Sequence, residues 1–196
     1  MNENFTDILA DNGEVIIDSL LDNEILKEIP ILGTSLKMIR GVQSIRDKSY
    51  LNKIKTFVEH VGEIDSKKRK KLIEESKKAE KKRVKFGDAI FTTIEQSDSL
   101  VKVEYIAIAF EAFLNDELQE SDLRLICHIV KNSFTDELID IIENEHPKDL
   151  QNVVASGLAD ISYPSLTFDL ESTEPKYSLS NSSKQLREAW KKYKMK

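Results

Sequence analysis

One stretch of the sequence is apolar on every side of a helix, and it sets the kind of fold that the chain can adopt. The stretch is Tyr105-Ile106-Ala107-Ile108-Ala109-Phe110, inside a helical pattern over 99–114. A helix that is apolar all round must be covered by other elements. Charged residues make up 33% of the chain, with only six glycines and four prolines, which favours helices over a turn-rich sheet. We therefore expect an all-α helical bundle with this stretch at its centre.

The remaining elements follow from helical spacing of apolar residues, from capping residues and from prolines. A change to alternating polar and apolar residues after 160 predicts two or three short strands. We expect a winged-helix-like tail, in which a helix, a short β-hairpin and a helix follow one another. The predicted helices are 14–28, 33–61 (continuous or bent near 41–48), the basic segment before 86, 86–96, 99–114, 121–134, 135–142, 147–157 and one capped by Asn181 or Ser182; the predicted strands are 161–163, 165–170 and 176–179.

Charge divides the chain into parts of opposite sign. Residues 67–85 hold eleven Lys or Arg against three Glu, whereas residues 87–150 hold fifteen Asp or Glu against four Lys or Arg. The whole chain has a formal net charge of -6. We predict N-terminal helices over 1–65, a basic helix over 66–85, an acidic helical core over 86–145 and the helix-hairpin-helix tail over 146–196. The 33–61 helix is expected to pack on the acidic core.

The basic helix is the feature that best predicts a function. Its apolar positions are too few to bury much surface, and its cations face several directions around the helix. A run of this kind steers a chain toward an acidic protein surface, a nucleic acid or an anionic membrane. The alternative is a solvated helix paired with the chain's own carboxylates. The predicted partner-binding residues are Lys67, Lys68, Arg69, Lys70, Lys71, Lys77, Lys78, Lys81, Lys82 and Arg83.

No catalytic or metal-binding constellation stands out in the sequence. The three histidines lie far apart, and neither paired Cys or His ligand spacings nor glycine-rich phosphate loops occur. We expect Cys127 and its neighbour His128 to be buried core residues. The carboxylates between Asn115 and Asp122 are expected to cap helices or face solvent, with an oxygen-ligated cation as the alternative. We predict a non-enzymatic protein without cofactor or metal, whose partner is another protein.

Two other binding functions stay open. Cations of the last helix, from Lys184 to Lys196, beside a hairpin suit a winged-helix-type DNA-binding regulator, although the preceding segment offers only Gln151 and Asn152 for base edges. Apolar residues mixed with Lys37 and Arg40 over 29–45 suit an amphipathic, membrane-associated effector. Packing of 29–45 against 99–114 would bury the same residues without lipid. The sequence leaves the oligomeric state undetermined.

The cellular location is inferred from cysteine usage and apolar patterning. A single cysteine allows no intramolecular disulfide, which favours a reducing compartment. The first residues lack a basic, apolar signal pattern, and no window offers about 18 uninterrupted apolar residues. We expect a cytoplasmic protein.

Several short motifs carry a resemblance to a known group of proteins. They are Ile29-Pro30-Ile31-Leu32-Gly33-Thr34, Ile45-Arg46-Asp47, the run from Tyr105 to Val130, Ser156-Gly157-Leu158 and Tyr177-Ser178-Leu179-Ser180. Over 28–190 the chain resembles small uncharacterised bacterial and prophage proteins, and over 86–142 it resembles the TerB helical region. The resemblance implies a cytoplasmic helical protein of a bacterium or its mobile elements, in phage defence or counter-defence. The TerB acidic metal-site residues do not map onto this sequence, so metal binding is not implied.

Overall fold

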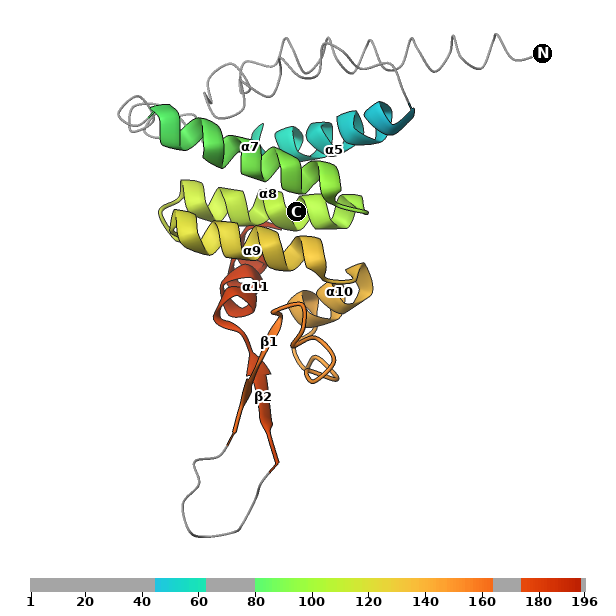
Figure 1. The fold of residues 1–196 in the computed structure, drawn as a ribbon, viewed down its shortest axis with the longest axis vertical. Helices are drawn as coiled ribbons and strands as arrows, with labels where there is room; N and C mark the ends of the chain where they lie inside the picture. The colour runs from blue at the N-terminus through green and yellow to red at the C-terminus, as the bar shows by residue number, and fades with distance from the viewer. Residues whose placement is uncertain (1–44, 63–79, 164–173, 195–196) are drawn as a thin grey trace, which may run out of the picture.

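The described part of the protein consists of six helices and a two-stranded hairpin (Figure 1). It covers residues 45–62, 80–163 and 174–194 of a computed structural model. The all-α prediction with a short C-terminal hairpin is confirmed. Among these residues no helix combines the length and the apolar character needed to cross a membrane. The elements are α5 (Ile45–Gly62), α7 (Glu80–Gln96), α8 (Leu100–Leu114), α9 (Glu120–Asn132), α10 (Thr135–Glu143), β1 (Ala159–Ser162), β2 (Lys176–Leu179) and α11 (Asn181–Tyr193).

Helix α8 is the centre of the core, as its apolar sequence predicts. It contacts α5, α7, α9 and α11, so neighbours cover it on several sides. Figure 1 shows α5 and α7 on one side of α8 and α9, with α10, α11 and the hairpin on the other. Val103, Ile106, Ala107, Ala109 and Phe110 are completely buried. The hydrophobic effect on this one helix therefore links both sides of the bundle.

Helix α5 packs on α8 and α7, as predicted for the second half of the 33–61 helix. Rings from three helices meet there: the Phe57 centroid lies 6.1 Å from that of Phe91 and 5.4 Å from that of Phe110. Edge-on and tilted ring pairs of this kind add to the stabilisation from area burial. The predicted packing of 29–45 against α8 concerns residues that lie almost wholly outside the described part.

Three predicted helix starts differ from the structure. Helix α7 begins at Glu80 rather than at 86, so the end of the basic segment and the core helix are one continuous helix. Helix α8 begins at Leu100 rather than at 99, and its N-cap is Ser99, whose hydroxyl accepts from Lys102 N. The N-cap of α9 is Gln119 rather than Ser121, and its N–H donates to Asp122 Oδ2 at 3.1 Å.

The predicted helix over 147–157 is wrong. The segment forms a series of turns, and Asp149 near its start has a positive φ angle of 54°, which an α-helix does not accept. Gly157, at the predicted end of the helix, has φ 84°. Asp140 Oδ2 of α10 accepts from the Lys148 N–H at 3.0 Å and holds the start of the segment. A Cβ at Gly157 would lie 3.1 Å from Ile129 Cγ1, so glycine suits both the backbone and the close packing here.

The hairpin and α11 form the predicted end of the fold. β1 and β2 pair antiparallel, with Ala159 opposite Leu179 and Ser162 opposite Lys176. The predicted strand over 165–170 lies outside the described residues. The N-cap of α11 is Ser180, one residue before the predicted cap, and its hydroxyl accepts from Ser183 N. Ser180 N and Ser183 Oγ both donate to Leu158 O, at 3.1 and 2.7 Å, so the cap ties α11 to the base of the hairpin.

Candidate functional site

The predicted partner-binding cations fall into two groups. Three of them, Lys81, Lys82 and Arg83, lie on the first turns of α7. Farther along the same helix Ile90, Phe91 and Ile94 are buried in the core. A continuous helix therefore joins the end of the cationic segment to the folded body. The other predicted residues, Lys67, Lys68, Arg69, Lys70, Lys71, Lys77 and Lys78, lie outside the described part of the chain.

Some cations of the last helix, α11, form hydrogen bonds or ion pairs within the protein. Arg187 Nη2 donates to the backbone carbonyls of Asn144 and Glu145, next to the end of α10. Lys192 pairs with Glu117, which also accepts from the Tyr193 hydroxyl at 2.5 Å. A winged-helix-type regulator would need Arg187 and Lys192 for DNA binding, but here both side chains contact other parts of the protein. That interpretation also lacks its recognition helix, because the predicted helix over 147–157 is a series of turns.

The predicted chemical candidates take different positions in the fold. Cys127 is buried as expected, and burial raises the pKa of its thiol to about 12. His128 is exposed beside Asn132, so its expected burial is wrong. It lies on the outer face of α9, about 100° around the helix from Cys127. A buried thiol whose proton is held this firmly is a poor nucleophile.

The carboxylates of the turn between α8 and α9 are engaged in helix caps and ion pairs. Asp122 caps α9, Glu120 pairs with Arg124, and Glu117 pairs with Lys192. Within residues 45–62, 80–163 and 174–194, no group of three or more His, Cys, Asp or Glu side chains is arranged to hold a metal ion.

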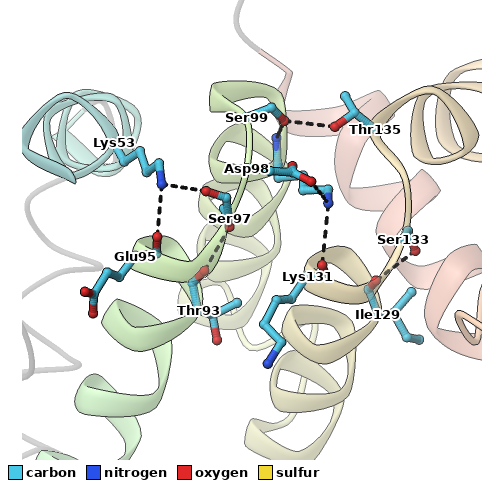
Figure 2. A network of polar contacts seen from close by, with 11 residues as sticks. Lys53, Thr93, Glu95, Ser97, Asp98, Ser99, Ile129, Lys131, Ser133 and Thr135 are labelled. Atoms are coloured by element: carbon cyan, nitrogen blue, oxygen red, sulfur yellow. Dashed lines mark hydrogen bonds and ion pairs between the residues drawn. The ribbon is translucent and has the colours of Figure 1, made fainter. Parts of the chain in front are cut away.

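The junction of α7 and α8 holds a buried lysine. Lys102 is 1% exposed, and its Nζ lies 3.0 Å from Asp98 Oδ2 and 3.5 Å from the Lys131 carbonyl oxygen of α9. In the same network Lys53 of α5 donates to the Glu95 and Ser97 carbonyls at 3.0 and 2.5 Å (Figure 2). The network fastens α5 and α9 to the connection between α7 and α8.

A second polar cluster lines a cavity of about 300 Å³. The cavity lies where four helices approach one another, and its lining residues come from all of them. Five of the lining side chains are ionisable and one is an indole. The lining residues include His60 of α5, Glu104 and Tyr105 of α8, Glu143 at the end of α10, Trp190 of α11 and Lys194 directly after it.

Tyr105 and Glu143 form the firmest contact in the cavity wall. The Tyr105 hydroxyl donates to Glu143 Oε1 at 2.6 Å. Burial raises the pKa of Tyr105 far above its usual value, and the hydrogen bond to Glu143 and the neighbouring carboxylate charges raise it further. The phenol therefore remains protonated and donates its hydrogen bond at every ordinary pH.

His60 is the unusual member of the cavity wall. Its side chain is 3% exposed, and its Nε2 lies 3.1 Å from Glu111 Oε2 of α8. Its Nδ1 is buried and has no hydrogen-bond partner among the described residues. Leaving such a group unpaired costs about 1 to 3 kcal/mol.

Sequence reasoning did not predict this cavity. His60 is one of three histidines that lie far apart in the sequence, and a lone histidine gives no ligand spacing. The available signal was its place in α5, next to Val61 and within a turn of Phe57, two completely buried residues. Such a position favours burial of the ring. The partners of His60 come from elements far away in the sequence, which periodicity does not bring together.

Comparison with protein families identifies the chain. A family model described as PaRep2b protein matches residues 32–170. The chain belongs to the PaRep2b family. The PaRep2b match includes α5 to α10 and β1, and it ends before β2 and α11. His60, Tyr105 and Glu143 therefore lie within the matched region, whereas Trp190 and Lys194 follow it.

Other comparisons add no further relative. No curated protein matches the chain, and no solved structure matches it. The predicted likeness of residues 86–142 to TerB is not part of the PaRep2b finding.

Proposed function

We propose that this PaRep2b protein is a non-enzymatic interaction protein that binds another protein through its cationic segment, residues 67–85. The observation that carries this proposal is the continuity of α7, which joins Lys81, Lys82 and Arg83 to a helix whose later residues are buried in the core. Because this helix continues into the core, it holds the end of the cationic segment at a fixed place on the protein. Such charges accelerate encounter with an acidic partner and set its orientation.

The setting of this function is also part of the proposal. The motifs that resemble bacterial and prophage proteins, and the TerB-like spacing over 86–142, support a role in phage defence or counter-defence. The lone, buried Cys127 fits a reducing compartment, so we place the protein in the cytoplasm.

A matched pair of charge-reversal variants tests the proposal. The first carries Lys68→Glu, Lys71→Glu, Lys78→Glu and Lys82→Glu; the control carries the same change at four exposed lysines elsewhere, Lys148, Lys176, Lys184 and Lys191. Both variants change the net charge by the same amount. In affinity purification from the native host with mass spectrometry, we expect the first variant to lose its partner and the control to keep it. Equal retention by both variants would contradict the proposal.

The same preparations distinguish the two other binding functions. Binding to duplex DNA that falls steeply between about 50 and 200 mM salt would favour the DNA-binding regulator. Flotation with anionic liposomes would favour the membrane-associated effector. Either result, together with an unchanged protein partner in the first variant, would replace the proposed function.

A further inference from the structure

Helix α7 has a buried side and an exposed side, and both can be followed along its length. Ile90 and Ile94 are buried in the core, whereas Thr92 and Gln96 are exposed. Residues seven or eleven positions apart along an α-helix lie within about 20° of each other around its axis. The later turns of α7 therefore show which side of its first turns continues the buried side and which continues the exposed side.

The cations on the first turns of α7 divide between these two sides. Arg83 lies seven positions before Ile90 and eleven before Ile94, so it continues the buried side. Lys85 lies seven positions before Thr92, so it continues the exposed side. Two cations that are close in the sequence therefore occupy opposite sides of one helix.

Lys81 and Lys82 also belong to the exposed side. They lie nine positions before the buried residues Ile90 and Phe91, which places them about 180° around the axis from these residues. Lys81, Lys82 and Lys85 are called the outer lysines of α7 below. The set of partner-binding residues predicted from the sequence includes Arg83 and leaves out Lys85, because charge alone does not distinguish the two sides of a helix.

On the basis of the proposed function, we infer that the outer lysines of α7, rather than Arg83, contact an acidic protein partner, and that Lys85 is one of the partner-binding residues. Beyond the lysines the exposed side continues with the uncharged residues Thr92 and Gln96, and Glu95 next to them is also exposed. A carboxylate there opposes a phosphate backbone, whose negative charges repeat along the whole duplex. The exposed side of α7 therefore suits a protein surface with a local group of carboxylates.

The test is binding of fluorescently labelled poly-L-glutamate to the full chain, measured by anisotropy in about 50 mM salt, where charge attraction is only partly screened. Lys85→Glu and Arg83→Glu form a matched pair, because each lowers the net charge by the same amount at nearly the same place in the sequence. Long-range attraction to the probe is therefore equal in the two variants. We expect Lys85→Glu to weaken binding about threefold or more, and Arg83→Glu to stay within about twofold of the native chain.

Two further measurements keep the result decisive. Circular dichroism checks that both variants retain their helices, and Lys85→Ala and Arg83→Ala repeat the comparison if Arg83→Glu does not fold. Tighter binding of duplex DNA than of poly-L-glutamate at the same salt concentration would overturn the inference of a protein partner.

The same titrations separate this inference from the proposed function. Absence of binding by the native chain would contradict the proposed function and the inference together. Binding that Lys85→Glu and Arg83→Glu weaken equally would overturn the inference alone, because the cationic segment would then bind without regard to the sides of α7.

Discussion

Two regions of this protein bury an ionisable side chain, Lys102 of α8 and His60 of α5. They differ in how completely the buried group is hydrogen-bonded. At the α7–α8 junction, Lys102 meets the Asp98 carboxylate and the Lys131 carbonyl. At the cavity, His60 meets Glu111 with one ring nitrogen and nothing described with the other. A buried polar group that is matched within the protein stabilises the fold, whereas one left half-matched costs folding free energy.

The contrast follows from what each residue connects. Lys102 contacts Asp98 in the loop before its own helix and the Lys131 carbonyl of α9. These contacts hold α8, the loop and α9 together. His60 lies in a wall made by α5, α8, α10 and α11, and its second nitrogen is not required to hold any of them together. The two regions should therefore differ in how much stability is lost when the buried group is removed.

The largest effect is expected from Lys102→Ala. The change removes a fully buried side chain and leaves the Lys131 carbonyl without this donor, so the free energy of unfolding should fall by about 2 to 4 kcal/mol. Lys102→Met keeps most of the stem and should cost less than about 1.5 kcal/mol. Urea denaturation measures both. Equal losses would mean that the ammonium contacts, rather than the packed stem, carry the stabilisation.

Tyr105→Phe should have an intermediate effect. Loss of the hydrogen bond to Glu143 should lower the free energy of unfolding by about 1 to 2 kcal/mol at neutral pH. The folded pKa of Tyr105 is raised, so its stabilising contribution is complete below the unfolded pKa near 10 and declines as pH rises above it. Denaturation from pH 7 to 11 should therefore show the two proteins converging. A constant difference across this range would contradict the raised pKa.

His60→Leu should change stability little. The lost hydrogen bond to Glu111 costs about 1 kcal/mol or slightly more, and removal of the unpaired Nδ1 offsets most of it. We expect a change in the free energy of unfolding below about 1 kcal/mol, measured by urea denaturation. A loss as large as that of Lys102→Ala would place His60 with the structural residues and remove the difference between the two regions.

The smallest effect concerns Cys127, another buried ionisable group. Its pKa of about 12 means that the folded thiol reacts slowly with iodoacetamide at pH 8, whereas the thiol of the urea-unfolded chain reacts normally. Mass spectrometry of timed samples measures the ratio. Comparable rates in the two states would show that the α9 face opens freely to solvent.

The fold follows from the sequence wherever one helix face decides the outcome. The continuous apolar run predicted α8 and its central place, and apolar spacing predicted α9, α10 and α11. The predicted helix over 147–157 is wrong because the backbone conformation of one residue matters there. Asp149 adopts φ 54°, which is incompatible with a helix through this position. The composition of the segment does not reveal this conformation.

The cavity was less predictable than the fold. Asp98 and Lys102 have the i, i+4 spacing of an ion pair. The same spacing occurs on exposed helices, so it does not predict that α9 packs against Lys102 and buries it. His60, Glu143 and Trp190 are brought together only by tertiary packing. The basic segment shows the reverse: its charge is plain in the sequence, and most of it lies outside the described residues.

The most direct test of the difference between the two regions is long-range ¹H–¹⁵N correlation spectroscopy of the histidine rings at neutral pH. For His60 we predict a proton on Nε2, held by the hydrogen bond to Glu111. His128 and His146, both exposed, serve as internal references. A His60 ring without a proton on Nε2 would contradict the account.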